Sequence, residues 1–182
     1  YIDIPLQHIS SHLLKKMKRG INKEKTIELV KSIRKSLPGA AIRTTFIVGH
    51  PGESEEDFDE LYEFIKEIEF DRMGVFTYSH EEGTESFRMD DSIPEVVKDE
   101  RANILMALQR DISLKKNRDK VGTEIRVLID RKEGDHFVGR TEMDSPEVDN
   151  EVLINTKNKL NIGDFYTVRI QSATDYDLEA EL

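Results

Sequence analysis

The sequence of 182 residues contains no cysteine. Disulfide bonds, thiolate metal sites and cysteine nucleophiles are therefore excluded for these residues. No apolar segment approaches the roughly 20 residues that a membrane-spanning helix needs, and no signal-peptide pattern is visible. Because both features are missing, we expect a cytoplasmic protein that has no membrane partner.

Basic residues are fewer than acidic residues. The chain has 27 lysine and arginine residues against 37 aspartate and glutamate residues, and its formal net charge is −10. Such a chain repels phosphate backbones unless its basic residues cluster. The two basic clusters, 15–19 and 115–120, fall in segments with a helical pattern, and solvated helix faces explain them better than a nucleic-acid site does.

Apolar periodicity predicts alternating strands and helices over the first two-thirds of the chain. The expected strands are Ile2–Leu6, Ala41–Val48 and Met73–Tyr78, and the expected helices are His12–Lys18, one from Asn22 to Leu37, one that follows Ser54, and a long one from about Pro94 to Val121. The connections are too long for hairpins, so the strands should be parallel. Three such units cannot close an eight-stranded barrel. We therefore expect half of a parallel β/α, TIM-like barrel whose other half lies outside this sequence.

Helix ends and faces give more local expectations. Ser10 or Ser11 can cap the first helix, and Ser54 with Asp57 forms a pair of the capping-box type. The long helix should bury an apolar stripe made of Val97, Ile104, Leu105, Leu108 and Ile112.

The pattern changes after Gly122. Short β segments follow one another between clusters of glycine, asparagine and aspartate: Glu124–Asp130, Phe137–Thr141, Val152–Ile154, Phe165–Gln171 and Leu178–Leu182. This spacing is typical of a small five-stranded antiparallel β-barrel. The expected fold class is thus α/β followed by all-β, with domains at 1–120 and 121–182.

Ligands of parallel β/α folds bind at the carboxyl ends of the strands. Gln7-His8, Gly49–Glu53 and Tyr78–Gly83 occupy these positions. The glycines of Gly49–Glu53 allow a ligand to approach the backbone, and the helix that follows has free N–H groups for a carboxylate or phosphate. A tight turn that needs glycine only for its geometry explains the segment equally well, so both interpretations stay open here.

Other polar residues near strand ends carry weaker signals. His8, His50 and His80 invite a metal or acid–base interpretation. Loop histidines are often solvent-exposed, however, and no pair has the four-residue spacing of a helical zinc site, so we expect no metal site. The carboxylates Glu81, Glu82 and Glu85 fit a solvated loop better than paired acid–base catalysis.

Arg43 lies within a strand that should be buried. A buried arginine needs an anionic partner. That partner is either a structural ion pair or the carboxylate of a ligand, and the sequence does not separate the two.

Several ordered motifs resemble those of a known family. The segments 1–8, 17–19, 43–53, 70–79 and 82–84 resemble the second half of the radical-SAM methylthiotransferase core. Asp144–Asp149 and the run 70–84 point to the RimO-type subfamily, and Gly163–Phe165 with Asp175–Leu178 resembles its TRAM domain, a small β-barrel. The resemblance covers nearly the whole chain.

The resemblance implies an enzyme that methylthiolates an aspartate of the twelfth small-subunit ribosomal protein. Such enzymes use S-adenosylmethionine and two [4Fe–4S] clusters, whose cysteine ligands would precede Tyr1. Because thiolates must hold the clusters, the chain by itself should be inactive. The catalytic residues stay unassigned. The resemblance and the strand-end positions together imply a partial S-adenosylmethionine site formed by Gln7, Arg43, Gly49, Pro51, Gly52, Phe76 and Tyr78.

The expected partner is a basic ribosomal protein. Residues 120–182 contain 8 lysine and arginine residues against 14 aspartate and glutamate residues, a net charge of −6. A TRAM domain that binds tRNA should be basic, whereas an acidic one complements a basic protein. Asp144, Glu147 and Asp149 are the expected docking residues, although the same loop could be a turn with capping carboxylates.

Three alternatives stay open at this point. The chain could belong to a tRNA methylthiotransferase of the MiaB type, which shares the architecture but should carry a basic TRAM surface. It could also be a non-catalytic docking module for a ribosomal protein or RNA. An unrelated β/α hydrolase or lyase is compatible with the absence of cysteine but not with the ordered motifs.

Overall fold

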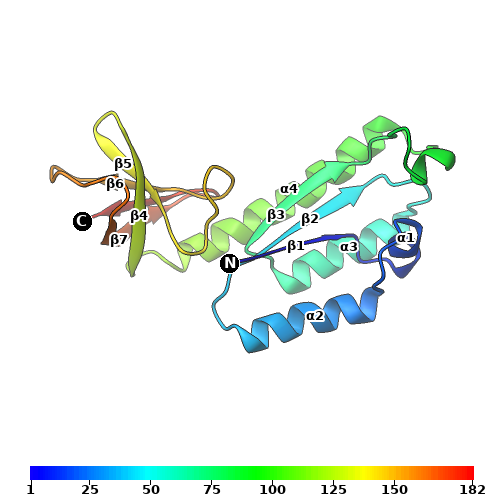
Figure 1. Cartoon of the computed structure of the whole chain (residues 1–182), viewed down its shortest axis with the longest axis horizontal. Coiled ribbons are helices and arrows are strands. Elements are labelled where there is room, and N and C mark those ends of the chain that lie inside the picture. Colours follow the sequence, from blue (N-terminus) through cyan, green and yellow to red (C-terminus); the bar gives the residue numbers. More distant parts are fainter. The chain divides into compact units, whose positions relative to one another are not determined.

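A computed structural model describes residues 1–182, and Figure 1 shows the order of the elements along the chain. None of the helices combines the length and the apolar character needed to cross a membrane. The first part contains β1 (Ile2–Gln7), α1 (Ser11–Lys16), α2 (Lys23–Ser36), β2 (Ile42–Val48), α3 (Glu55–Ile68), β3 (Arg72–Thr77), a short 3-10 helix (Ser86–Arg88) and α4 (Glu95–Arg118). The second contains β4 (Glu124–Glu133), β5 (His136–Arg140), β6 (Val152–Asn155), β7 (Phe165–Ala173) and β8 (Leu178–Glu181).

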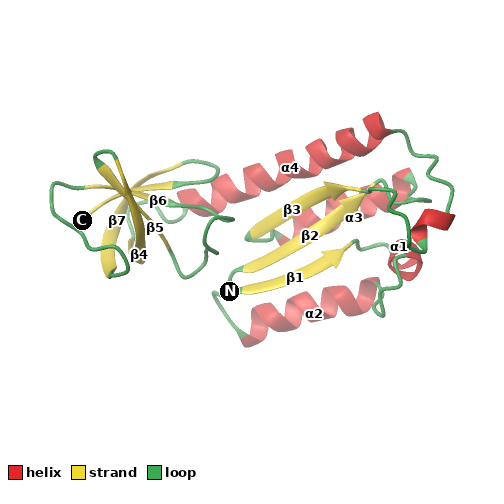
Figure 2. Ribbon diagram, turned by 45° about the horizontal axis from the view of Figure 1, so that its top comes forward, coloured by secondary structure: helices red, strands yellow, loops and turns green.

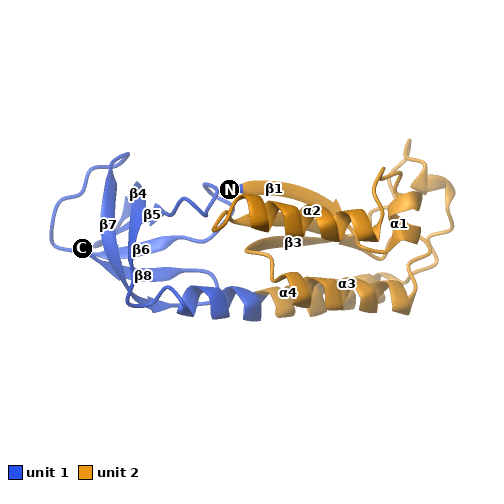
Figure 3. Cartoon of the chain, turned by 90° about the horizontal axis from the view of Figure 1, so that it is seen from below, with its two compact units in different colours: residues 1, 110–182 blue, residues 2–109 orange.

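The chain divides into two compact units, residues 2–109 and residues 110–182 together with residue 1 (Figure 3). The division falls inside α4, because the last turns of this helix pack with the strands that follow. The Asn117 side chain donates a hydrogen bond to the carbonyl of Thr174 at 3.1 Å, and the N–H of Gly122 donates to the carbonyl of Ile170 at 2.8 Å. The domain boundary expected at residue 120 stays a prediction.

The first unit contains a three-stranded parallel sheet in the order β1-β2-β3, as the strand–helix alternation predicted. Strands β2 and β3 pair without interruption from Arg43 opposite Arg72 to Val48 opposite Thr77. The pairing of β1 with β2 is irregular between Ile4 and Gln7, and Gln7 has a φ angle of 72°. The end of β1 therefore departs from regular strand pairing, whereas the ends of β2 and β3 do not.

The two faces of the sheet differ. Side chains at alternate positions of β2 are buried, and the ring of Phe46 meets those of Phe64 on α3 and Phe70 edge-on, at 6.4 and 5.8 Å between centroids. Figure 2 shows the strands in front of α3, with α2 and α4 running alongside. On the opposite face, Ile47 lies beside Phe76, whose side chain is 62% exposed. The helices therefore cover one face and leave the other open.

Helix capping follows the prediction at α3 and departs from it at α1. The Ser54 hydroxyl accepts from the N–H of Asp57, and the Asp57 carboxylate accepts from the N–H of Ser54, which completes the capping box. Ser10 occupies the N-cap position of α1, but its side chain makes no capping hydrogen bond. Ser10 instead donates to Asp57 at 2.5 Å, and Ser11 accepts from the N–H of Lys23. The charged carboxylate is a stronger hydrogen-bond partner than a backbone amide.

The inward face of α4 was predicted only in part. Leu105 and Ile112 are buried, but Ile104 is 39% exposed, so its assignment to the buried stripe is wrong. The buried positions between and beside them are polar: Lys98, Arg101, Gln109 and Ser113. A hydrophobic periodicity cannot detect such a face, because charged residues are usually placed on the solvent side.

The second unit is a closed barrel in the order β4-β5-β6-β8-β7. Its neighbours are antiparallel except β6 and β8, which are parallel. The expectation of a purely antiparallel five-stranded barrel is therefore wrong for this pair. The reason is parity, since directions cannot alternate around a closed ring with an odd number of strands. The barrel core consists of Val127, Ile129, Phe137, Val152, Ile154, Leu160, Val168, Ile170, Leu178 and Ala180.

We expect Phe46→Ala to lower the free energy of unfolding of the first unit by about 3–5 kcal/mol, because it empties a fully buried aromatic site. The matched control is Phe76→Ala, on the open face of the same sheet, which should change stability by less than about 1 kcal/mol. Urea denaturation followed by far-UV circular dichroism measures both. Equal losses for the two variants would contradict the assignment of covered and open faces.

Candidate functional site

A cavity of about 550 Å³ lies at the carboxyl ends of the strands in the first unit. This volume falls within the range of small-molecule sites, about 300–1,000 Å³. Its lining comes from the strand ends, the turn after α1 and the loop after β3: Gln7, Met17, Lys18, Arg19, Ile47, His50, Phe76, Thr77, Tyr78, Ser79, Glu81, Thr84 and Ser86.

One wall of the cavity is apolar and aromatic. Ile47 and Phe76 are neighbours across β2 and β3 and extend the open face of the sheet into the cavity. The rings of Tyr78 and His50 meet edge-on with centroids 5.1 Å apart. A flat aromatic or apolar group is the ligand feature that such a wall accommodates.

The rim of the cavity carries charge of both signs. Lys18, which has a φ angle of 55°, forms an exposed ion pair with Glu85 of the loop after β3. Arg19 is exposed, and its guanidinium has no hydrogen-bond or ion-pair partner. Glu81 supplies a carboxylate on the loop side. The rim can therefore receive a ligand that has both an anionic and a cationic group.

His50 is buried at the cavity edge. Its Nδ1 lies 3.2 Å from the carbonyl oxygen of Pro51, and its Nε2 lies 2.9 Å from the Ser86 hydroxyl. Since a carbonyl only accepts, Nδ1 carries the proton and Nε2 accepts from Ser86. Burial lowers the pKa of His50 below its ordinary value of 6.5, and the positive charge of Lys16 acts in the same direction. A neutral imidazole therefore joins the Gly49–Glu53 segment to the loop after β3.

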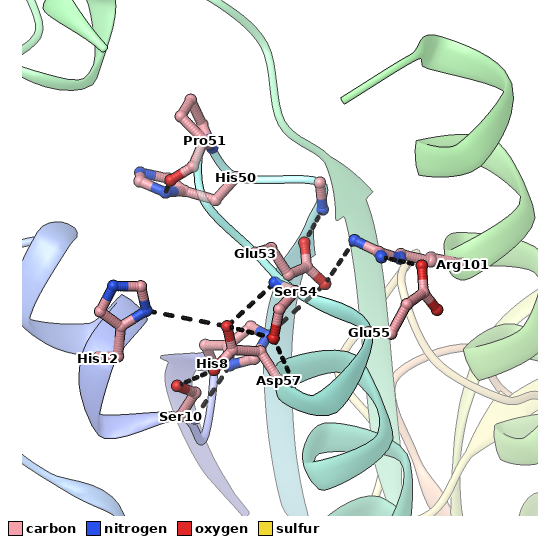
Figure 4. Close-up of polar contacts among 11 residues, drawn as sticks. His8, Ser10, His12, His50, Pro51, Glu53, Ser54, Glu55, Asp57 and Arg101 are labelled. Atoms are coloured by element: carbon pink, nitrogen blue, oxygen red, sulfur yellow. Dashed lines mark hydrogen bonds and ion pairs between the residues drawn. The ribbon is translucent and has the colours of Figure 1, made fainter. Parts of the chain in front are cut away.

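A polar network lies behind this segment (Figure 4). Glu53 is fully buried, and one of its carboxylate oxygens accepts a hydrogen bond from the N–H of Gly49. Its other oxygen lies 3.5 Å from Arg101 Nη1 and 3.8 Å from His8 Nε2. Burial alone would raise the pKa of Asp57, but hydrogen bonds from Ser10 and Ser54 lower it overall. The network fixes the start of α3 and the turn before it.

The residues expected around the cavity fall into two groups. Gln7, Phe76 and Tyr78 line it, whereas Gly49, Pro51 and Gly52 form the turn beside it without lining it. Both glycines have positive φ angles, 75° and 84°. A Cβ at Gly49 would lie 2.8 Å from Cδ of Lys98, and one at Gly52 would meet the side chain of Lys16. Turn geometry and close packing by lysine therefore account for both glycines.

Arg43 does not line the cavity. It stands near the amino end of β2, five residues before Val48, a separation of about 16 Å along a strand. Its side chain is half-buried, and its Nε lies 3.9 Å from Asp3. Of the two interpretations that the sequence left open, the position of Arg43 agrees with a structural ion pair.

Two of the three histidines near strand ends are buried, whereas the loop carboxylates are exposed. His80 is exposed, as loop histidines usually are, but His8 and His50 are buried, contrary to that expectation. His8 accepts a hydrogen bond from the N–H of Ser10, and His50 accepts one from the Ser86 hydroxyl. No group of three or more histidine, aspartate or glutamate side chains is placed to hold a metal ion. Glu81, Glu82 and Glu85 are exposed, as predicted.

The sequence did not predict the rim residues Lys18 and Arg19, or Ile47 of the apolar wall, as part of the cavity. Lys18 and Arg19 follow a short helix rather than a strand, so the rule of strand ends did not select them. The motif 17–19, which resembles that of a known family, was the one feature of the sequence that pointed to these two residues. Ile47 could have been found from strand register, because it has the same parity as the exposed Phe76.

The expected docking loop 144–149 lies in the second unit. Asp144 is buried and accepts a hydrogen bond from the Thr141 hydroxyl at 2.6 Å. Asp149 accepts from the N–H of Ser145 at 2.9 Å. Glu147 is exposed with a φ angle of 64°, and its carboxylate has no hydrogen-bond or ion-pair partner. Two carboxylates thus shape the loop, and Glu147 is the one available to a partner.

Two family models match separate parts of the chain. Residues 1–65 match the radical SAM superfamily, and residues 121–182 match the TRAM domain. Over its whole length the chain is 55% identical to a protein of Cytophaga hutchinsonii named ribosomal protein uS12 methylthiotransferase RimO, of which it covers 42%. Proteins of the same name from Christiangramia forsetii and Flavobacterium johnsoniae are both 56% identical, with 40% and 42% covered. The chain thus spans about two-fifths of these relatives' length.

We expect the titration midpoint of His50, followed by NMR, to lie below its ordinary value of 6.5. Because the unfolded state then takes up the proton first, the contribution of neutral His50 to stability is complete above about pH 6.5 and declines as the pH falls. His50→Gln should remove this part of the decline in urea stability between neutral pH and about pH 5. A midpoint above 6.5 would show that the imidazole is not held neutral by burial.

Proposed function

We propose that this chain belongs to the radical SAM methylthiotransferases that carry a TRAM domain. In a ribosomal protein uS12 methylthiotransferase, it would be the part that binds S-adenosylmethionine and the protein substrate. The observation that carries the proposal is the cavity at the carboxyl ends of β1, β2 and β3. Its lining residues come from the three strand ends and from the turn after α1. The reaction proposed for the whole enzyme is methylthiolation of an aspartate side chain of the ribosomal protein.

The residues of the cavity fit S-adenosylmethionine. Phe76, Tyr78 and His50 would contact the flat adenine, and Gln7 would offer its amide to the ribose hydroxyls. Arg19, which has no partner within the chain, would bind the carboxylate, and Glu81 would face the amino group. When bound, this cofactor supplies the radical chemistry of the superfamily. The chain's own residues hold and orient it, and the aromatic wall excludes water from one side.

The iron–sulfur clusters do not fit this chain. Cysteine thiolates are the ligands of [4Fe–4S] clusters, and these 182 residues contain none. We therefore assign no electron-transfer step to the chain and expect it to be inactive on its own. The open face of the sheet, where Ile47 and Phe76 lie, supports a barrel completed by other strands of a longer protein.

The barrel supports a basic protein as the substrate. Its residues 120–182 carry a net charge of −6, and complementary charge accelerates the encounter of two proteins. A TRAM domain that binds tRNA would need a basic surface, so the charge argues against the tRNA methylthiotransferase interpretation. The loop 144–149 presents Glu147 and the exposed Val148 side by side, a small amphipathic surface for such a partner.

We expect Phe76→Ala in the full-length enzyme to weaken S-adenosylmethionine binding about tenfold or more, because it removes an aromatic wall that contributes roughly 1–3 kcal/mol. Isothermal titration calorimetry measures the affinity. Phe165→Ala is the matched control, since Phe165 is similarly exposed, at 55%, but lies on the barrel. If the wild-type enzyme and both variants bind S-adenosylmethionine with equal affinity, the cofactor binds elsewhere.

We expect Glu147→Gln to weaken binding of the ribosomal protein about two- to fivefold at low salt, and less at high salt, as one exposed ion pair would. Asp144→Asn should instead lower stability, because it disturbs the buried hydrogen bond from Thr141. Affinity at two salt concentrations and thermal unfolding separate the effects. If Glu147→Gln leaves the affinity unchanged at low salt, the docking surface lies outside this loop.

A further inference from the structure

Helix α4, Glu95–Arg118, lies entirely outside both matched segments, 1–65 and 121–182. It nevertheless buries two cations in the first unit, Lys98 at 1% and Arg101 at 5% exposure. A buried charge is costly unless it is paired. The partners of these two side chains therefore indicate what α4 contributes.

Arg101 points toward the start of α3, as Figure 4 shows. Its Nη2 donates to Glu55 at 2.7 Å, its Nη1 lies 3.5 Å from Glu53, and its guanidinium lies 5.4 Å from the ring centre of Phe58. The second oxygen of Glu53 accepts the N–H of Gly49. Arg101 is thus joined through Glu53 to the first residue of the turn that carries His50.

The other neighbour of Glu53 cannot replace Arg101. His8 Nδ1 accepts a hydrogen bond from the N–H of Ser10 at 3.0 Å, so its proton lies on Nε2. This nitrogen is 3.8 Å from Glu53, beyond hydrogen-bond distance. Arg101, whose Nη1 forms an ion pair with Glu53 without a hydrogen bond, is therefore the permanent positive charge beside the buried Glu53 carboxylate.

Lys98 acts on the same turn from one helical turn earlier. Its aliphatic stem packs on Gly49, where a Cβ would lie 2.8 Å from Cδ of the lysine. Its ammonium group donates to Asp91 at 2.8 Å and Glu95 at 2.7 Å. The same nitrogen lies 5.4 Å from the ring centre of Tyr78, which lines the cavity. Lys98 thus touches both the turn and an aromatic wall residue.

We infer that Lys98 and Arg101 of α4 are positioning residues for the cavity at the strand ends. Neither side chain lines the cavity. Arg101 acts through Glu53 and Gly49 on the turn that presents His50, and Lys98 acts through Gly49 and the ring of Tyr78. The inference rests on the proposed function, because the ligand of this cavity is the proposed S-adenosylmethionine.

The chemistry of the two residues defines the variants that test them. Arg101→Gln leaves Glu53 without its cation, whereas Arg101→Lys restores the charge but cannot reach Glu53 and Glu55 together. Lys98→Met retains a stem that can pack on Gly49 and removes only the ammonium group. Asp99→Asn, at an exposed position of the same helix, is the matched control.

Amide hydrogen exchange of Gly49 in the 182-residue chain, followed by NMR, tests the inference without any ligand. We expect Arg101→Gln to accelerate this exchange about tenfold or more, because Glu53, which accepts the N–H of Gly49, loses the cation that stabilises its charge. Arg101→Lys should restore part of the protection, and Asp99→Asn should match the wild type. The N–H of Phe46, in the middle of β2, should keep its protection. Equal acceleration at Phe46 and Gly49 would mean general destabilisation and would overturn the inference.

The full-length enzyme provides a second readout. Arg101→Gln and Lys98→Met should raise the KM for S-adenosylmethionine about tenfold and leave the KM for the ribosomal protein unchanged. If the wild-type enzyme does not bind S-adenosylmethionine, the proposed function fails, while the exchange experiment still decides the role of Arg101. Wild-type exchange and wild-type KM in both variants would overturn the inference itself.

Discussion

The carboxylate of Glu53 is the group on which the candidate site depends. It is fully buried, and it is held by a backbone N–H of Gly49 and by the cation of Arg101. A buried carboxylate without these partners would cost several kcal/mol of free energy or take up a proton. The turn before α3 can therefore adopt its observed path only while α4 supplies the charge. Strand β2, the turn, α3 and α4 are coupled through this one side chain.

The second constraint is the difference between the two faces of the parallel sheet. Packing of Phe46 against α3 anchors one face, so the alternating side chains Ile47 and Phe76 must point away from the helices. An open apolar face next to strand ends supplies the wall of the cavity, and the turn after α1 supplies its charged rim. The cavity therefore follows from strand parity together with the position of a six-residue helix.

The barrel shows how closure limits topology. Five strands that close into a ring need one parallel pair, which here is β6 with β8. This pair places the last strand beside β6. The loop 144–149 precedes β6 and exposes Glu147 and Val148. In that loop Asp144 and Asp149 stabilise the turn itself, so the negative charge of the barrel is only partly available to a partner. Net charge alone does not reveal this division.

Periodic apolar residues and helix caps determined the order of strands and helices, the change to a β domain after Gly122 and the capping box of Ser54 and Asp57, because these are local properties of the chain. Motif order predicted the family. Tertiary structure alone decided that Lys98 and Arg101 face inward, since their partners Glu53 and Asp91 are distant along the chain or in a loop. It also decided which residues border the cavity. The physical reason is that a charge can be buried only where folding brings an opposite charge to it. The periodicity of apolar residues along the sequence does not show where such a pair will form.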